Sequence, residues 1–530
     1  MSPYQSDILI IGCGIAGASA ALRLAQDRQR QITIITRSTE PEDSNTRYAQ
    51  GGIVTLGEGD SSELLVEDIL AAGDGLCLAS AARILAEEGP ELVDEILVEL
   101  IGVNFDRSPD GRMDYGREGA HSRPRILHVG DSTGRAIIQA LIAALRKQPN
   151  VHIVTSATAV DLITFPHHAR DPLTVYEPIN CHGVYVFDQS HLTIHRYLAG
   201  VTILATGGLG RIYRHTTNPE GARGDGLAMA YRAGARVINA EYIQFHPTVL
   251  PVADGEGFLI SEAMRGEGGR LLTPDSHPFM GDYAPQWGDL APRDVVARAI
   301  HHQMIEHGYH HVLLDIHSAM SPEGIKTRFP TIFTRCMELG IDITRQPIPV
   351  VPAAHYACGG VWTDEWARTT IQNLYAVGEV ACTGIHGANR LASTSLLEGL
   401  VWGDRAARDI NGLDSLVTVS PDDVPQWEEE GLEEADSALI RRDMRTIQHT
   451  MWHYVGLVRS AGRLARALRD LNHQKETIDT FYRTTKLNDA LIGLRHSVQV
   501  ALIVARAALH NRVSRGCHYR DDRAGAATIY

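Results

Sequence analysis

DILIIGCGIAG, at residues 7–17, decides the fold of this 530-residue chain. Its first five residues form a continuous apolar run of the kind found in buried parallel strands, and ASAALRLAQ follows at helical spacing. Gly12, Gly14 and Gly17 match the G-x-G-x-x-G pattern between that strand and that helix. The pattern predicts that a dinucleotide pyrophosphate binds at the helix N-terminus; the alternative is a purely structural glycine turn.

The segment after the first helix departs from a simple NAD site. QITII at residues 31–35 is predicted as the second strand, and it ends on Thr36 and Arg37. An NAD site of this type carries an acidic residue there, which binds the ribose hydroxyl. The polar, glycine-ended loop SNTRYAQGG follows at residues 44–52, and loops beside such folds commonly carry ligand contacts.

A second glycine-rich region lies at residues 353–399, where AAHYACGG is followed by NLYAVGEVACTGIHGANRLASTSLLEG. Residues 374–377 read as a short strand with Gly378 and Glu379 at its carboxyl end, and a helix is predicted to begin near Ser395. Open α/β sheets bind ligands at that end of their strands. The alternative is a glycine-rich packing corner.

Composition limits the classes of protein. The length predicts more than one domain, and a net charge of −15 argues against nucleic-acid binding. The seven cysteines are scattered without a C-x-x-C pair, so we expect neither a disulfide framework nor a metal site, and we expect a cytoplasmic protein. We see no targeting peptide and no apolar run of membrane-spanning length.

Further elements follow from periodicity. Helix is predicted over residues 61–100 with a break at Gly89 and Pro90, a glycine-rich turn over 261–269, and three helices after about residue 420. In a helix predicted over 290–304, Pro292 suits the first position and places Arg293 in the first turn. A cation there opposes the helix dipole, which suggests a functional role for Arg293; the alternative is that Asp289 or Asp294, which lie nearby, neutralises it.

Nine motifs together resemble flavoproteins of the succinate dehydrogenase and fumarate reductase family: GCGIAG, SNTRYAQGG, ATGG, GDGLAMAYRAGA, QFHPT, RGEGG, LAPRD, AAHYACGG and the 373–399 stretch. The resemblance covers most of the chain. It implies an α/β fold with a discontinuous Rossmann-like FAD-binding domain (1–248 and 353–420). It also implies an inserted α+β capping domain (249–352) and a C-terminal three-helix domain (421–530).

The resemblance also implies which residues bind FAD. They lie in the first glycine turn, after the second strand, in the polar loop and around the second glycine-rich region: Gly12, Cys13, Gly14, Ile15, Ala16, Gly17, Thr36, Arg37, Asn45, Thr46, Arg47, Tyr48, Ala49, Gln50, Gly51, Gly52, Asp225, Glu379, Ser395 and Leu396. Members that attach FAD covalently carry a histidine where this chain has Asn45. FAD is therefore expected to bind non-covalently.

For a C4 dicarboxylate substrate, the resemblance places His246, Ser261 and Glu262 at one carboxylate and His355 with Arg390 at the other. Arginine suits this task because its planar guanidinium pairs bidentately with a carboxylate. Arg293 matches the family's proton-shuttling arginine, and electrostatic stabilisation is the more cautious role for a guanidinium.

REGAHSRPRILH, at residues 117–128, resembles the members that oxidise L-aspartate to iminoaspartate, the first step of de novo NAD biosynthesis. Glu118 would pair with the substrate's ammonium group. Hydride would pass from the α-carbon to flavin N5, and oxygen or fumarate would reoxidise the cofactor.

Two other readings remain open at this point. One is a soluble fumarate reductase or succinate-oxidising subunit; the other is an idle flavin-binding scaffold, which the presence of His246, Arg293, His355 and Arg390 disfavours. The expected partners are L-aspartate and fumarate, with quinolinate synthase as a protein partner and neither nucleic acid nor membrane.

Overall fold

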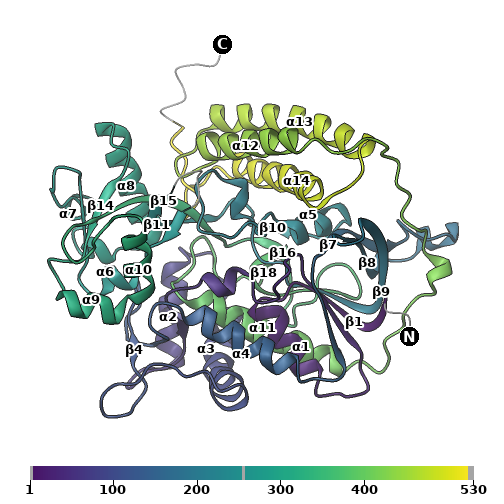
Figure 1. The fold of residues 1–530 in the computed structure, drawn as a ribbon, viewed down its shortest axis with the longest axis horizontal. Coiled ribbons are helices and arrows are strands. Elements are labelled where there is room, and N and C mark those ends of the chain that lie inside the picture. Colours follow the sequence, from purple (N-terminus) through teal and green to yellow (C-terminus); the bar gives the residue numbers. More distant parts are fainter. Residues whose placement is uncertain (1–3, 253–256, 523–530) are drawn as a thin grey trace.

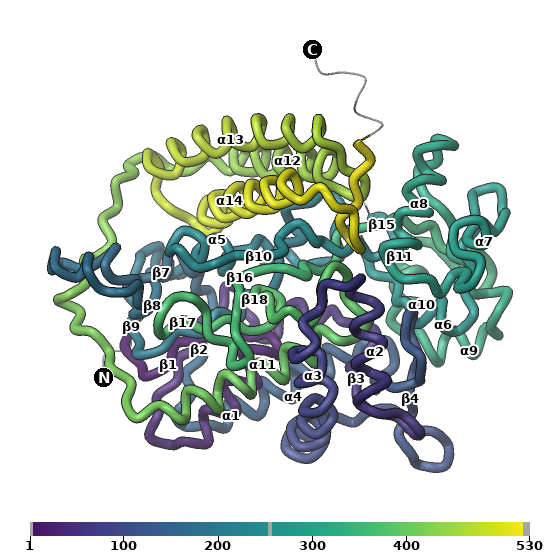
Figure 2. The backbone as a smooth tube through the Cα atoms, turned by 180° about the vertical axis from the view of Figure 1, so that it is seen from behind, coloured from purple at the N-terminus to yellow at the C-terminus, as the bar shows by residue number. Residues whose placement is uncertain are grey.

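The computed structural model describes residues 4–252 and 257–522. A central sheet runs through the body of the molecule, with one group of helices below it and the C-terminal helices above it (Figure 1). A lobe with its own sheet stands at one end of this body. The same arrangement is seen from behind in Figure 2.

The central sheet is built around β1 (Gln5–Ile11), which pairs in parallel with β2 (Ile32–Ile35) and β9 (Thr193–Leu204). The other members are β6 (Val151–Val154), β7 (Ala157–Phe165), β8 (Asn180–Asp188) and β17 (Leu374–Ala376). Ile11 is in register with both Ile35 and Leu204, and Leu204 with Ala376. The parallel strands therefore end together, which brings the glycine turn, Thr36 and the 378–379 segment to one edge.

Helices cover the lower face of this sheet. They are α1 (Ile15–Leu24), α2 (Ser62–Ala72), α3 (Ala79–Leu92), α4 (Thr133–Leu145) and α11 (Thr394–Asn411). α11 packs closely on α1 because Gly399 and Gly403 occur one turn apart on the contact face. A Cβ added at Gly403 would lie 2.6 Å from the Ala16 carbonyl oxygen.

The predicted break at Gly89 and Pro90 is wrong. α3 continues through both residues into a π-helix (Val93–Leu100), and the interruption lies earlier, between the Gly73 C-cap of α2 and the start of α3. Gly89 does not form a turn. It allows α3 to pack closely on α11, since a Cβ there would lie 2.7 Å from Leu397 Cδ2. Tertiary contact with α11 therefore overrides the local breaker pattern.

The lobe at the end of the body, called the side lobe below, contains a sheet in the order β12 (Gly257–Leu259), β11 (Ile243–Pro251), β15 (Ile348–Ala357), β14 (Val312–Asp315) and β13 (Arg270–Leu272). Its helices are α6 (Ala263–Gly266), α7 (Met280–Tyr283), α8 (Arg293–His307), α9 (Pro322–Arg328) and α10 (Pro330–Glu338). β11 and β15 connect this lobe to the body.

Two local predictions in the side lobe change. The 261–269 stretch, predicted as a turn, contains the single helical turn α6. Pro292 is the N-cap of α8 and not its first residue, so Arg293 begins the helix. The shift of one residue leaves Arg293 in the first turn, as predicted.

Smaller elements complete the body. They are the three-stranded sheet of β3 (Ile53–Val54), β5 (Ile126–Leu127) and β4 (Tyr115–Gly116), a second one of β10 (Val237–Ile238), β16 (Gly360–Trp362) and β18 (Ala381–Cys382), and helix α5 (Asp225–Arg232).

Three helices follow residue 420, as predicted: α12 (Ser437–Tyr454), α13 (Ala461–Thr484) and α14 (Asp489–His510). Within the described residues, α14 is the one helix that is long and apolar enough on average to span a membrane, although Arg495 and His496 interrupt its apolar run. Of its apolar window, 78% is buried inside the protein. α14 is thus packed as a core helix, joining the cluster formed by β8, β9 and α5.

The α1–α11 contact yields a stability prediction. Gly403→Ala should destabilise the protein by about 1–3 kcal/mol, because the new methyl group meets backbone that cannot move aside easily. Thermal unfolding measures the difference. In the matched control, Gly462→Ala in α13, the new methyl group meets nothing within 4 Å. Since alanine favours helix over glycine, this variant should be neutral or slightly more stable. Equal losses of stability in both variants would contradict the packing argument.

Candidate active site

A long pocket lies at the edge where the parallel strands end. It runs from Arg37 and Ala159 in the body to Glu118, His246 and Arg293 beside the side lobe. Every residue predicted to bind FAD lines it except Gly17 and Arg47, and all seven predicted substrate residues line it too. Among the residues that the structure describes, no group of three or more histidine, cysteine or acidic side chains is placed to hold a metal ion.

The first glycine turn brings backbone close to the pocket. Gly12 has φ +111°, and a Cβ there would lie 2.2 Å from the Ala205 carbonyl oxygen. A Cβ at Gly17 would lie 2.2 Å from the Gly12 carbonyl oxygen, so Gly17 acts through packing although it does not line the pocket. The first turn of α1 carries no acidic residue and faces the pocket with its amide groups. Such a turn favours an anion.

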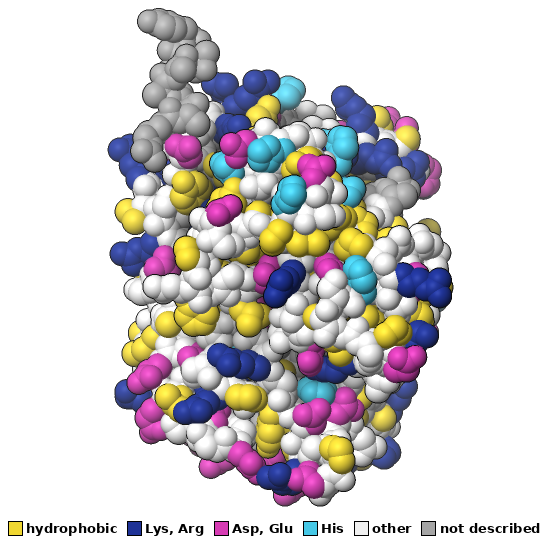
Figure 3. Space-filling model, turned by 90° about the vertical axis from the view of Figure 1, so that its left-hand side faces the viewer, with side chains coloured by type: hydrophobic (Ala, Val, Ile, Leu, Met, Phe, Trp, Pro, Cys, Tyr) yellow, Lys and Arg dark blue, Asp and Glu magenta, His cyan; other side chains and the backbone are white. Residues whose placement is uncertain are grey.

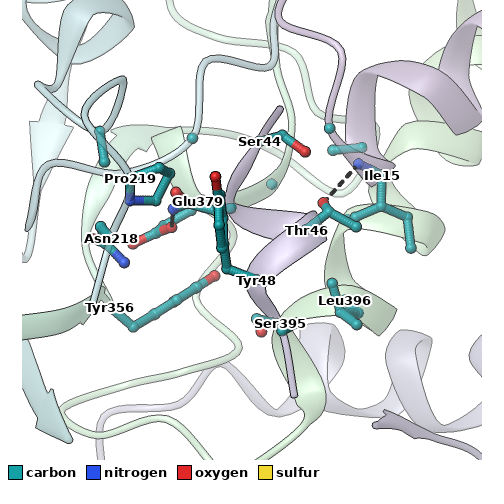
Figure 4. A pocket seen from close by; sticks show the side chains of 18 of the residues that line it. Ile15, Ser44, Thr46, Tyr48, Asn218, Pro219, Tyr356, Glu379, Ser395 and Leu396 are labelled. Carbon is teal, nitrogen blue, oxygen red and sulfur yellow. Dashed lines mark hydrogen bonds between the residues drawn. The ribbon is translucent and has the colours of Figure 1, made fainter. Parts of the chain in front are cut away.

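Other polar groups on the pocket wall also fit FAD. Ile15 N donates to Thr46 Oγ1 at 3.0 Å, and this bond fixes the polar loop over the glycine turn (Figure 4). Gln50 Oε1 and Thr206 Oγ1 are buried on the wall without a hydrogen-bond partner. Since buried polar atoms are normally paired, these atoms fit a polar ligand in the pocket.

Glu379 is a partly buried carboxylate in the lining of the pocket. It accepts hydrogen bonds from Asn45 Nδ2 at 2.9 Å and from Ala357 N at 3.0 Å. Burial raises its pKa from 4.5 to about 7, against the lowering effect of those two donors. The hydrogen bond to Glu379 thus gives the Asn45 amide a partner within the protein.

The far end of the pocket is braced by the C-terminal domain. Asp489, the first residue of α14, pairs with Arg37 at 3.3 Å and with Arg223 at 3.0 Å. Arg223 also pairs with Asp225, which His496 contacts at 3.0 Å. Burial alone would raise the pKa of Asp225, but Arg223 and His496 hold it below its ordinary value. Two predicted cofactor residues, Arg37 and Asp225, are thus tied to α14.

Two guanidinium groups share one amide at the other end. Gln244 Oε1 accepts from Arg293 Nη1 at 3.3 Å and from Arg390 Nη2 at 3.2 Å. Arg390 also donates to Ser395 Oγ at 2.9 Å, and its guanidinium carbon lies 4.3 Å from the ring centroid of Tyr356. Arg390 Nε is buried without a partner, so this end of the pocket is ready for an anion.

Glu262 supplies the negative charge that holds Arg293. Its carboxylate bonds to Arg293 Nε and pairs with Arg265 at 3.0 Å. Burial would raise the Glu262 pKa, but Arg293 and Arg265 lower it to about 2. The alternative that Asp289 or Asp294 neutralises Arg293 is wrong, because Asp294 pairs with Arg298 and the Asp289 carboxylate accepts from Leu271 N. A helical aspartate one residue along points to another side of α8.

Two histidines face each other at the base of the side lobe, with ring centroids 5.1 Å apart. His355 Nδ1 is 2.7 Å from Thr217 Oγ1, and His246 Nδ1 is 3.2 Å from Thr248 N. Burial, followed by nearby positive charges, holds the pKa of His246 well below 6.5; for His355, burial and His246 do the same. Both rings are therefore neutral at pH 7 and can donate one hydrogen bond each.

Glu118 enters the same chamber from the loop after β4. It accepts a hydrogen bond from Ser393 Oγ at 2.7 Å, and a Cβ on Gly51 would lie 2.4 Å from its Oε1. Burial raises its pKa, and the charge of Glu262 adds to that. A ligand that brings positive charge would favour its ionised form.

Three residues that line the pocket or contact its lining were not predicted from the sequence: Gln244, Tyr356 and Asp489. Gln244 lies two positions before His246 on β11, so strand alternation could have placed both on one face. Asp489 carried no such signal, because its partners are about 270 and 450 residues away in the chain. Tyr356, whose side chain lies opposite Ile15 in Figure 4, reads as an ordinary strand residue.

Two protein-family models match the chain. The one described as an FAD binding domain matches residues 7–396, and the one described as the C-terminal part of the fumarate reductase flavoprotein matches residues 444–525. Together they span most of the chain, the first from β1 to the start of α11 and the second from within α12 to residue 525.

Curated relatives resemble the chain along nearly its whole length. L-aspartate oxidase 1 of Ralstonia nicotianae is 44% identical, covering 97% of this chain and 95% of that protein. L-aspartate oxidase of Pseudomonas aeruginosa is 42% identical, covering 98% and 96%. Among solved structures, the E. coli quinol fumarate reductase is 28% identical with a TM-score of 0.86, covering 98% of this chain and 91% of that one.

The perturbed carboxyl of Glu379 yields a pH prediction for the flavin-free protein. Its pKa is raised on folding, so its contribution to stability is present below pH 4.5 and is lost as the pH rises to about 7. Relative to Glu379→Gln, the wild type should lose about 3 kcal/mol over that range. Urea unfolding of both proteins at several pH values measures the difference. A difference that stays constant with pH would contradict the raised pKa.

Proposed function

The chain belongs to the L-aspartate oxidase family of FAD-dependent flavoproteins, and on that premise we propose how its residues oxidise L-aspartate. The reaction converts L-aspartate to iminoaspartate with FAD as cofactor, in the biosynthesis of NAD. We assign the long pocket to FAD and the chamber around Arg293 and Arg390 to the substrate.

One observation carries this assignment: the chamber combines two arginines with a separate buried carboxylate. Arg293 and Arg390 converge on Gln244, while Glu118 lines the same pocket and accepts a hydrogen bond from Ser393. L-Aspartate has two carboxylates and one ammonium group. The chamber thus offers a charge of opposite sign to each charged group of this substrate.

Binding would proceed through the cations and the neutral imidazoles. Arg390 and His355 hold one carboxylate, and His246 and Ser261 hold the other. Glu262 is a positioning residue in this proposal, because its carboxylate is already bonded to Arg293 and Arg265. This revises its expected role as a direct substrate contact, since a carboxylate repels a carboxylate.

Oxidation removes a hydride from the α-carbon and a proton from the nitrogen. FAD, when bound, supplies the hydride acceptor at flavin N5. Glu118 Oε2 would accept the proton, because the raised pKa of this carboxyl suits a proton acceptor near neutral pH. Arg293 stabilises negative charge on the substrate and keeps its own proton. The surrounding side chains exclude water, since Glu118, His246, Glu262 and Arg293 are all buried.

A fumarate reductase or succinate-oxidising subunit, the alternative reading, would have no use for Glu118. Succinate lacks an ammonium group, and a buried carboxylate near its two carboxylates would oppose binding. Glu118 therefore favours the amino-acid substrate.

The domain assignment extends the same proposal. Residues 249–352 act as a capping domain over the body formed by 1–248 and 353–420, with 421–530 as the C-terminal domain. The cap brings Arg293 to the site on α8. All seven cysteines are free, which supports a reducing cytoplasm. A complex with quinolinate synthase stays a prediction.

The function is tested by flavin reduction without oxygen. L-Aspartate mixed anaerobically with the purified yellow protein should bleach the flavin absorbance near neutral pH, because its two carboxylates and its ammonium group match the charged groups of the chamber. Succinate lacks the ammonium group, and L-glutamate is one methylene longer than the C4 dicarboxylate for which the site is proposed. L-Glutamate and succinate should leave the absorbance largely unchanged. Bleaching by succinate alone would overturn the assignment.

Glu118→Gln tests the ammonium contact. The variant should lower kcat/KM for L-aspartate by about ten- to a hundredfold, since it removes a charge-assisted hydrogen bond. Fumarate reduction by the same variant should change much less. Steady-state assays with both substrates provide the comparison, with Glu267→Gln in the side lobe as the control. Equal losses in both assays would remove Glu118 from the ammonium site.

A further inference from the structure

A second cavity lies outside the active site, between the side lobe and the C-terminal domain. It has a volume of about 600 Å³ and is lined by α8 on one side and by residues 452–463 and 519–521 on the other. We call it the α8 groove. On the face of the molecule that carries the side lobe, histidines gather with apolar side chains in the upper part of the view (Figure 3).

The groove carries more cationic than anionic side chains. Arg298, Arg459 and Arg463 line it, and Asp521 is the one acidic residue in its described lining. Burial lowers the pKa of His301 and His453, so these two lining histidines are neutral at pH 7. This contrasts with the net charge of −15 for the whole chain. Positive charge concentrated on an acidic protein selects an anionic ligand.

Arg459 gives the most specific indication. Its side chain is fully buried, and it donates from Nε to Gly456 O at 3.0 Å and from Nη1 to Glu241 O at 2.7 Å. Among the residues that the structure describes, Nη2 has no hydrogen-bond partner, and it is buried. A buried guanidinium N–H without an acceptor is costly, so an acceptor brought by a ligand would satisfy it.

The remaining walls are apolar and aromatic. Trp452, Leu457 and Val458 come from the C-terminal domain, and Tyr283 and Ile305 come from the side lobe. Aromatic walls with a few cationic groups suit a planar ring that carries an anion. A volume of about 600 Å³ lies within the usual range for small-molecule sites. We propose that the α8 groove is an effector site for an aromatic anion the size of a mononucleotide.

A chain of hydrogen bonds connects the groove to the two arginines of the substrate chamber, so a ligand in the groove can act as an effector of substrate binding. Arg298 Nη2 donates to Asp294 Oδ2 at 2.7 Å, and Asn389 Nδ2 donates to Asp294 Oδ1 at 3.0 Å. Gln244 Nε2 in turn donates to Asn389 Oδ1 at 2.8 Å. Gln244 Oε1 is the acceptor shared by Arg293 and Arg390.

Helix α8 can transmit the effect of a ligand in the groove to the substrate chamber, because it contributes residues to both. The helix presents Arg293 to the substrate chamber at its first residue and Arg298, His301 and Ile305 to the groove further along. An anion that attracts Arg298 competes with Asp294 for its guanidinium. Asp294 then changes its hold on Asn389, and Gln244 shifts its position between the two arginines. Such coupling should appear in KM for L-aspartate.

Calorimetric titration of the FAD-saturated holoenzyme with AMP tests the site. AMP should bind. Adenosine and inorganic phosphate should each bind at least about tenfold more weakly, because adenosine lacks the anionic phosphate and inorganic phosphate lacks the aromatic ring. Arg463→Gln, which changes an exposed arginine of the groove, should weaken AMP binding roughly tenfold. Arg469→Gln, on the same helix but outside the groove, should leave it unchanged.

Kinetics test the coupling. Saturating AMP should change KM for L-aspartate by about fivefold or more in the wild type, and Asp294→Asn should abolish the change while AMP still binds. AMP that fails to bind, or that binds all groove variants equally, overturns the site; equal binding would point to residual occupancy of the FAD pocket. Phosphate binding as tightly as AMP overturns the aromatic part, and AMP binding without any change in KM overturns the effector role. The calorimetric result does not depend on which substrate the protein oxidises, so it stands or fails separately from the proposed function.

Discussion

Two buried guanidinium groups that share the Gln244 carboxamide are the constraint on which the rest of the site depends. Burying like charges close together is unfavourable unless they are paired and hydrogen-bonded. Glu262 pairs with Arg293 but also serves Arg265, while Arg390 has only neutral partners: Gln244, Ser395 and the face of Tyr356. The chamber therefore keeps a net positive charge. In the proposed function, the carboxylates of the substrate neutralise it.

This constraint explains why the site lies where the side lobe meets the body. Arg390 comes from the segment before α11, which is fixed by the packing of α11 on α1, whereas Arg293 comes from the start of α8 in the side lobe. Gln244 and His355 lie on β11 and β15, the strands that connect the two parts. Neither part alone holds both arginines, so the site is complete only when the side lobe packs against the body.

The C-terminal helices support both ends of the pocket and are more than an appended bundle. Asp489 ties α14 to Arg37 and Arg223 beside the predicted adenosine position. At the other end, Arg459 and its neighbours face α8 across the groove, and Arg298 links that groove to Asp294. A change in how these helices sit would be transmitted to cofactor and substrate residues alike.

The sequence alone determined what depends on local pattern. The glycine turn between β1 and α1, the three C-terminal helices and the place of Arg293 in the first turn of α8 all follow from spacing and motif, because strand, turn and helix preferences act over a few residues. The assignment of Arg390 to the site rested on the family resemblance. Only the tertiary structure decided the partners. Glu262 replaced Asp289 and Asp294 at Arg293, Pro90 stayed within a helix, and Asp489 paired with Arg37 of the pocket lining. Each of these contacts joins residues that the fold brings together in space, and local pattern carries no record of which distant side chain will satisfy a buried charge.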